Sequence, residues 1–268
     1  MLKFIEIKSP SKRGKFLKVI MNGQRRENFM STIALILASG KGQRTRQDIP
    51  KQFINVYDKP IIIYTLETFQ KHPEIDAIFV VCLDGWHDIL RAYSRQYNIT
   101  KLKEIVEGGA TVQESSRNGV FAIKEQYADD DIVVVHDGIR PMVDEEVLSD
   151  VIATCRKYGN GVTSLPYNEQ IFRKFDDTCT KEYIVRETLR RVQTPQAYKL
   201  GKLYWAYKKA FEEEIGIYGS SYVNTMMVDL GETLYFASGS DKNIKITTVD
   251  DIEIFKTLIS AKKTSWLK

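Results

Sequence analysis

The chain has 268 residues, 43% of them hydrophobic and 28% charged, which suffices for one large domain with a buried core, or at most two. Its glycine and proline content excludes a collagen-like or disordered chain, and no apolar run is long enough to span a bilayer. Residues 30–268 hold 31 basic and 33 acidic side chains, so the body lacks the basic footprint of a nucleic-acid-binding protein.

The first 29 residues are the basic part of the chain, with eight basic and two acidic side chains. They lack the long apolar stretch and cleavage site of a secretory signal, and they contain two glutamates, unlike a mitochondrial presequence. We interpret residues 1–29 as a non-catalytic extension upstream of a functional start at Met30. Binding to an anionic partner or surface is the alternative. Residues 30–268 are then expected to form the functional domain.

The cysteines are odd in number and show no C-x-x-C spacing: Cys82, Cys155 and Cys179. This spacing indicates neither a disulfide framework nor a zinc site. We therefore expect reduced thiols in a cytoplasmic protein that associates with neither membrane nor nucleic acid.

From Thr32 onward, short β-branched runs alternate with helical patterns, which predicts a doubly wound, Rossmann-like α/β fold with a mostly parallel sheet. Three continuous apolar runs are typical of strands covered on both faces: residues 33–37, 77–83 and 132–136. Apolar residues spaced three and four apart predict helices at 61–70, 85–97, 113–126 and 145–158.

A further strand is predicted at 162–166, after which residues 167–186 are polar and lose both periodicities. A compact α/β domain does not need such a stretch, so we expect it to protrude from the sheet as an arm. The remaining pattern predicts helices near 202–213 and 222–229, strands at 234–237 and 244–247, and a closing helix at 249–261.

A glycine-rich turn, residues 38–44, follows the first buried strand. Such turns let backbone N–H groups approach phosphates at the carboxyl edge of a sheet. It matches neither the P-loop nor the dinucleotide fingerprint, which disfavours a dehydrogenase. Its basic residues, together with Lys51, suit a triphosphate whose pyrophosphate must leave, although a solvated basic turn is the alternative.

Asp137 ends the most hydrophobic predicted strand, at the position where a magnesium ligand would meet substrate phosphate. A helix or turn cap is the alternative, although Glu145 and Glu146 are available to the next helix. The neighbouring His136 is expected to be structural. Lys245 has apolar neighbours on both sides, and such a lysine is rarely left without a charged partner, so it is expected to point at phosphate.

Six motifs follow one another along the chain: A-x-G-x-G-x-R, P-K-Q-[FY], G-G followed by E-S, H-D-x-x-R-P, Q-T-P-Q and N-I-K-[IV]-T. In this order they resemble the cytidylyltransferase family of the 2-C-methyl-erythritol 4-phosphate and ribitol 5-phosphate enzymes, over about residues 31–262. The resemblance implies a GT-A-like nucleotidyltransferase that uses CTP and Mg²⁺ and forms a homodimer through the arm at 167–186.

The resemblance also implies roles for individual residues. Nucleotide binding is expected from Ala38, Ser39, Gly40, Gly42, Gly109, Ala110 and Ser115. The catalytic cations would be Arg44, Lys51 and Lys245, and Asp137 would bind the metal. Acceptor binding is expected from Arg140, Gln170, Arg186, Thr194 and Ser221.

Several positions depart from the family pattern, mostly where the acceptor is expected. Val112 replaces a frequent arginine, Gln170 a threonine, and residues 221–224 replace the segment T-D-[DE]-A of the erythritol enzyme. The added amides of Gln170 and Asn224 favour a polyol phosphate with more hydroxyls. We therefore expect ribitol 5-phosphate as the acceptor, for surface polysaccharide synthesis. The alternatives are the erythritol enzyme of isoprenoid synthesis and a non-catalytic nucleotide-binding module.

Overall fold

The computed structural model describes residues 30–40, 49–219 and 222–264. The basic extension 1–29 and the predicted site residues Gly42, Arg44 and Ser221 lie outside these ranges. Within them, no helix combines the length and the apolar character needed to cross a bilayer.

A seven-stranded sheet forms the centre of the fold, in the order β11-β7-β10-β6-β1-β4-β5. β10 runs antiparallel to both of its neighbours, whereas the other neighbouring pairs are parallel, which confirms a mostly parallel sheet. The strands are β1 (Thr32–Ala38), β4 (Ala77–Cys82), β5 (Leu102–Glu107), β6 (Ile132–Asp137), β7 (Asn160–Pro166), β10 (Arg190–Lys199) and β11 (Phe236–Ser238).

Helices cover both faces of the sheet, because successive strand side chains point to opposite sides. Ala34 and Ile36 of β1 belong to the core beneath α1 (Ile61–Lys71), α2 (His87–Gln96) and α4 (Glu145–Tyr158). Ile33 and Leu35 belong to the core beneath three helices on the other face: α3 (Val112–Lys124), α5 (Leu200–Glu212) and α6 (Val223–Asp229).

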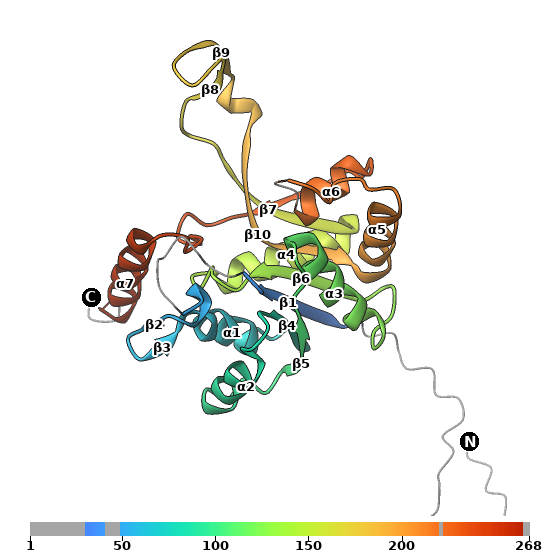
Figure 1. The fold of residues 1–268 in the computed structure, drawn as a ribbon, viewed down its shortest axis with the longest axis vertical. Coiled ribbons are helices and arrows are strands. Elements are labelled where there is room, and N and C mark those ends of the chain that lie inside the picture. Colours follow the sequence, from blue (N-terminus) through green and yellow to red (C-terminus); the bar gives the residue numbers. More distant parts are fainter. Residues whose placement is uncertain (1–29, 41–48, 220–221, 265–268) are drawn as a thin grey trace, which may run out of the picture.

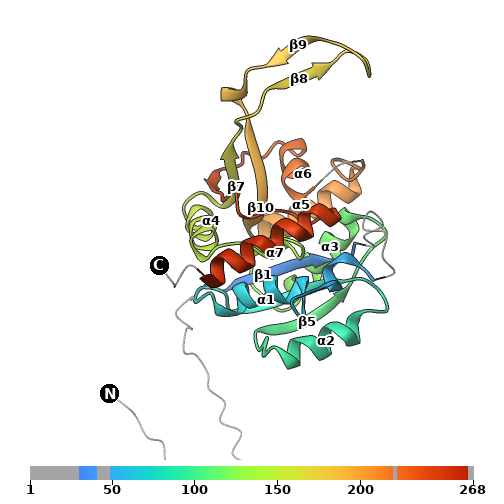
Figure 2. The ribbon, with the colours of Figure 1, turned by 90° about the vertical axis from the view of Figure 1, so that its left-hand side faces the viewer.

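The closing helix α7 (Val249–Thr264) packs outside the two main layers, as Figure 2 shows. Its Ile252, Phe255 and Ile259 share a separate small core with Ile139 and Ile246. This core also includes Ile61 at the start of α1 and Val56 of β2 (Asn55–Val56), which pairs with β3 (Lys59–Pro60) in a small hairpin. The C-terminal segment is thereby fastened beside the carboxyl end of β6.

Among the differences from the sequence prediction, three concern the central sheet and the segment before the closing helix. Residues 244–247 do not form the expected strand. In the described part of the chain, this segment is held by isolated hydrogen bonds rather than by strand pairing, such as the one that Ile246 N donates to Ile139 O at 2.9 Å. β5 was missed because this edge strand is only half-buried and lacks a continuous apolar run. β10 was missed because arginines, glutamines and a proline interrupt it.

The stretch 167–186 protrudes from the sheet, as predicted, and Figure 1 shows it extending away from the body between β7 and β10. It is more regular than expected, since β8 (Ile171–Lys174) and β9 (Thr180–Ile184) pair as an antiparallel hairpin. A single turn of 3-10 helix, Arg186–Thr188, follows it. Phe172 and Tyr183 are 58% and 67% exposed, so the hairpin presents aromatic side chains that this chain does not cover.

Candidate active site

The candidate site lies where β1 and β6 end side by side. The two strands are parallel and in register, with Leu37 opposite Asp137, so the glycine-rich turn and the segment after β6 emerge at the same sheet edge. Ligands of open α/β sheets bind at this edge. Two cavities meet there, and both are lined by Leu37, Val112, Asp137, Tyr222 and Lys245.

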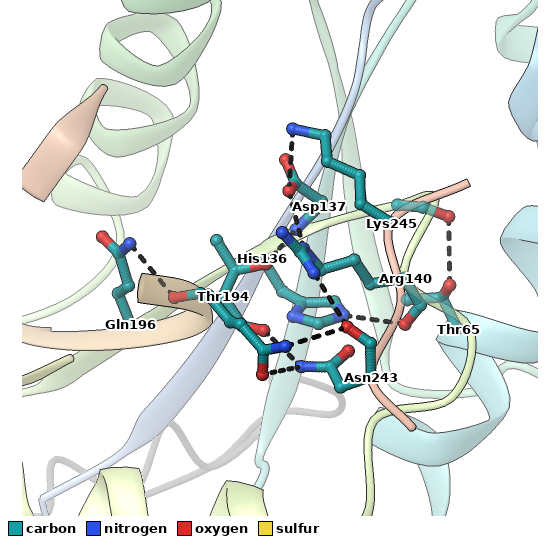
Figure 3. Close-up of polar contacts among 10 residues, drawn as sticks. Thr65, His136, Asp137, Arg140, Thr194, Gln196, Asn243 and Lys245 are labelled. Atoms are coloured by element: carbon teal, nitrogen blue, oxygen red, sulfur yellow. Dashed lines mark hydrogen bonds and ion pairs between the residues drawn. The ribbon is translucent and has the colours of Figure 1, made fainter. Parts of the chain in front are cut away.

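Asp137 stands between two cations (Figure 3). Its Oδ2 accepts from Arg140 Nε at 3.1 Å and lies 3.1 Å from Lys245 Nζ. Burial alone would raise the pKa of Asp137, but the charges of Lys245 and Arg140 outweigh this effect and hold that pKa below its ordinary value. The carboxylate is therefore ionised at neutral pH, and it does not act as a helix cap, because α4 begins after Asp144.

The Asp137 carboxylate is suited to a hard cation. Its contacts within the described residues use Oδ2, which leaves Oδ1 for a ligand. No group of three acidic, histidine or cysteine side chains surrounds a common point in that part of the chain. A metal here would therefore be held by one carboxylate, by water and by substrate oxygens, which is how magnesium is commonly bound at phosphate-transfer sites.

A buried amide fixes the cluster from behind. Asn243 is 0% exposed and donates through Nδ2 to Thr194 O at 2.7 Å, while its backbone carbonyl oxygen accepts from Arg140 Nη1 at 2.8 Å. Thr194 Oγ1 in turn accepts from the backbone N–H of Asp137 at 3.1 Å. Three segments far apart in sequence are thereby held together. The N-I-K motif contained Asn243, but sequence reasoning gave a role only to Lys245.

His136 is structural, as expected. It is 0% exposed, contacts the ring of Phe69, and donates from Nε2 to Arg140 O at 3.1 Å. Burial lowers its pKa to about 4, so the ring is neutral at physiological pH. The bond to the carbonyl requires the Nε2–H tautomer and holds the turn that carries Arg140.

One cavity measures about 200 Å³ and brings Lys51 together with four residues that are expected to bind nucleotide: Ala38, Ser39, Gly40 and Ser115. We call it the nucleotide-side cavity after this expectation. Ser39 Oγ donates to Ser115 Oγ at 2.9 Å, which joins the turn after β1 to α3. Gly108 makes this approach possible, because a Cβ there would lie 2.5 Å from the Cβ of Ser39.

Gly109 and Ala110 line neither of these two cavities, and their N–H groups already have partners. Gly109 N donates to Ser115 Oγ at 3.0 Å, and Ala110 N donates to Glu114 Oε2 at 2.6 Å. Glu114 also belongs to the capping box that begins α3. The two residues can therefore offer a ligand their carbonyl oxygens rather than N–H donors.

The second cavity measures about 300 Å³ and contains the expected acceptor residues Arg140 and Thr194. Asn224 lines it too, and so does Gln196, to which sequence reasoning gave no role of its own. Gln196 is held by its neighbours, since its Oε1 accepts from Tyr198 OH at 2.8 Å and its Nε2 donates to Gln193 O at 3.3 Å.

Gln170 and Arg186 are not brought into this site. Both belong to the exposed arm and line neither cavity. Arg186 instead pairs with Glu187 and donates to Asn168 O at 3.2 Å. If these two residues bind an acceptor, they reach it in another molecule.

Comparison with known proteins gives consistent matches over the body of the chain. The family profile described as 2-C-methyl-D-erythritol 4-phosphate cytidylyltransferase matches residues 32–260. A ribitol-5-phosphate cytidylyltransferase of Lacticaseibacillus paracasei is 56% identical over 230 residues, covering 86% of this chain and 98% of that protein. A 2-C-methyl-D-erythritol 4-phosphate cytidylyltransferase of Clostridium novyi is 35% identical over 232 residues, covering 86% and 97%.

Among solved structures, the chain is similar to 4-diphosphocytidyl-2C-methyl-D-erythritol synthase from Anaerococcus prevotii. The TM-score is 0.73 at 25% identity, and the match covers 86% of this chain and 99% of the other.

Proposed function

This chain belongs to the 2-C-methyl-D-erythritol 4-phosphate cytidylyltransferase family, and from that premise we propose that it transfers the cytidylyl group of CTP to ribitol 5-phosphate. The observation that carries the proposal is the Asp137, Lys245 and Arg140 cluster on the wall where two cavities meet. One cavity would hold the nucleotide and the other the acceptor.

The reaction needs positioning and charge rather than a protein base. An oxygen of the acceptor phosphate forms a bond to the α-phosphorus of CTP, and the bond from that phosphorus to the bridging oxygen breaks to release pyrophosphate. The attacking phosphate is already ionised at neutral pH. Lys51 and Lys245 offset the repulsion between the two anions, and the resemblance assigns Arg44 the same task.

We assign the magnesium site to Asp137, whose contacts with Arg140 and Lys245 use Oδ2 and leave Oδ1 for a ligand. A magnesium ion bound there would neutralise charge on the triphosphate. Asp137→Asn removes one anionic oxygen, so the variant should need more magnesium for half-maximal activity. A magnesium titration of pyrophosphate release checks this, and an unchanged midpoint would remove Asp137 from the metal site.

The choice of ribitol 5-phosphate rests on two observations. The chain is 56% identical to a ribitol-5-phosphate enzyme but 35% identical to an erythritol enzyme. In addition, Gln196, Thr194 and Asn224 give the second cavity amides and a hydroxyl that can bond an acceptor's hydroxyl groups. The CDP-ribitol formed would serve surface polysaccharide synthesis.

We also propose a homodimer joined through the arm, which would bring Gln170 and Arg186 of one subunit to the acceptor of the other. Support comes from the exposed aromatic side chains of the hairpin.

The thiols of Cys82, Cys155 and Cys179 are unpaired with one another, which fits a reducing cytoplasm.

The decisive assay measures pyrophosphate release over a matrix of nucleoside triphosphates and phosphorylated polyols. We expect the highest kcat/KM for CTP with ribitol 5-phosphate, and none without magnesium. CTP binding without pyrophosphate release for any acceptor would favour a nucleotide-binding module. A preference for the methyl-erythritol phosphate would return the chain to isoprenoid synthesis.

A further inference from the structure

A buried glutamine ties together two of the segments that line the nucleotide-side cavity. Gln52 is 1% exposed, and its Nε2 donates to Ala38 O at 2.7 Å and to Gly40 O at 3.1 Å. The bonded residues are 14 and 12 positions away, at the end of β1 and in the turn that follows it. One amide therefore uses both of its N–H donors on the backbone of the glycine-rich turn.

The short helix that carries Gln52 is anchored on its other side as well. Lys51–Phe53 is a single turn of 3-10 helix, in which Phe53 N donates to Pro50 O at 2.8 Å. The ring of Phe53 stacks on Trp86 with centroids 4.6 Å apart. Lys51 lines the cavity, and the two residues that follow it are both fixed. Gln52 is bonded to the glycine-rich turn, and Phe53 is stacked on Trp86.

The bonds of Gln52 also decide which backbone groups face the ligand. A carbonyl oxygen turned toward a triphosphate would repel it, whereas an N–H group attracts it. Because Ala38 O and Gly40 O are directed to the amide of Gln52, they are held in place and partly neutralised. The same amide sets the position of Lys51 relative to that turn.

We propose that Gln52 is a positioning residue for the nucleotide, which holds residues 38–40, at the start of the glycine-rich turn, and Lys51 in the relative arrangement that binds the triphosphate. This inference rests on the proposed function, because it takes the nucleotide-side cavity as the CTP site. Gln52 itself lines this cavity, and the inference adds a role for its side chain, to which the proposed function assigns none.

The test replaces the amide by a carboxylate of nearly the same shape. In Gln52→Glu the ionised group can no longer donate, and it faces two carbonyl oxygens. We expect the kcat/KM for CTP to fall about a hundredfold, because a small misplacement of binding groups costs on that order. The KM for ribitol 5-phosphate at saturating CTP should change much less.

Gln113→Glu is the matched control. Gln113 is 2% exposed and donates from Nε2 to Gly216 O at 2.7 Å, but it lines neither cavity. Both variants lose a buried amide donor to a backbone carbonyl, so both should melt at a lower temperature. Only Gln52→Glu should lose affinity for CTP when activity is expressed per folded molecule.

A pH series separates positioning from general destabilisation. A protonated glutamate has one O–H donor, and burial raises the pKa of a carboxyl group. The activity of Gln52→Glu relative to the unmodified chain should therefore rise as the pH falls from about 8 to about 5. The corresponding ratio for Gln113→Glu should stay flat.

CTP binding by calorimetry, without acceptor, keeps the outcome independent of the acceptor assignment. Weaker binding by Gln52→Glu supports the inference even if no polyol phosphate reacts, in which case only the proposed function fails. If Gln52→Glu does not fold, Gln52→Met provides the same length without a donor. Normal CTP affinity and turnover in either folded variant would overturn the positioning role.

Discussion

The cluster around Asp137 and the hairpin arm differ in where their polar groups find partners. In the cluster, the bonds of Thr194 and Asn243 join residues 49 to 103 positions apart. In the turn of the arm the hydrogen bonds are local: Asp176 Oδ1 accepts from the backbone N–H and the side-chain hydroxyl of Thr178, two residues away. The cluster is therefore arranged by the fold of one chain, whereas Phe172 and Tyr183 of the arm remain 58% and 67% exposed among the described residues.

This difference separates what one subunit can do from what the proposed homodimer would add. A preorganised cluster stabilises charge without rearranging during the reaction. An exposed aromatic hairpin gains its stability by contact with another surface. The first region should respond to loss of charge, and the second to loss of its partner.

Removing a cation from the cluster region should have the largest effect. We expect Lys51→Ala and Lys245→Ala each to lower turnover about a hundredfold or more, since a lost electrostatic contact in a preorganised site costs ~2.7–4 kcal/mol. Steady-state pyrophosphate release measures this. Lys242→Ala, an exposed lysine on the same segment as Lys245, is the control and should be near normal. Near-normal turnover in both site variants would remove the two lysines from the mechanism.

The pH dependence of stability should reveal the buried histidine behind the cluster. The pKa of His136 is lowered from 6.5 to about 4, so between these values the unfolded chain binds a proton that the folded chain does not. The free energy of unfolding should therefore fall with decreasing pH across this window, by about 3 kcal/mol for this group.

His136→Gln keeps a donor for Arg140 O but cannot titrate. Urea unfolding of both proteins across the same window should show a shallower pH dependence for this variant. His72 titrates unchanged in both proteins and cancels from the difference. Parallel pH curves for the two proteins would contradict the assignment of a neutral buried His136.

Mixing defective subunits should test whether the arm acts on a partner. In a mixed dimer of Lys51→Ala and Arg186→Ala chains, one site combines an intact Lys51 with an intact partner arm. After random exchange of equal amounts, about half of the dimers are mixed, and each mixed dimer has one intact site. The mixture should therefore show about a quarter of normal activity, more than either variant alone. Activity assays after subunit exchange measure this. A chain that sediments as a monomer at assay concentration, or a mixture no better than its parents, would rule out the shared site.

Deleting residues 1–29 should have the smallest effect. The family profile begins at residue 32, and the two cavities are lined by residues from 37 onward. We expect normal kcat/KM and an unchanged melting temperature for the truncated chain. Loss of folding or activity would make the basic extension part of the domain.

The sequence predicts the place of Asp137 in the fold better than the residues that hold it in place, for a physical reason. Asp137 is predictable because the apolar run of β6 ends there, and buried parallel strands deliver their ligands at such ends. Thr194 reaches the cluster on β10, whose sequence shows no continuous apolar run. β10 is held in the sheet by antiparallel pairing with two neighbouring strands. Pattern alone cannot show pairing partners.

The same limit applies to Asn243 and Gln52. Each lies inside a recognised motif, but its role depends on a carbonyl distant in sequence, which no local periodicity specifies. The strand predicted at 244–247 failed for the related reason that α7 and Ile139, rather than a neighbouring strand, fix that segment. The arm was predictable as a departure from the sheet, whereas its hairpin pairing was not.

A competition between the two candidate acceptors tests the central claim most directly. Ribitol 5-phosphate and 2-C-methyl-erythritol 4-phosphate at equal concentration would be incubated with the enzyme, magnesium and CTP labelled in the α-phosphate, and the labelled products separated. The ratio of products equals the ratio of kcat/KM values. We predict that labelled CDP-ribitol dominates, because a site built to bond hydroxyl groups discriminates against an acceptor that has fewer of them. Predominance of the methyl-erythritol product would contradict the account.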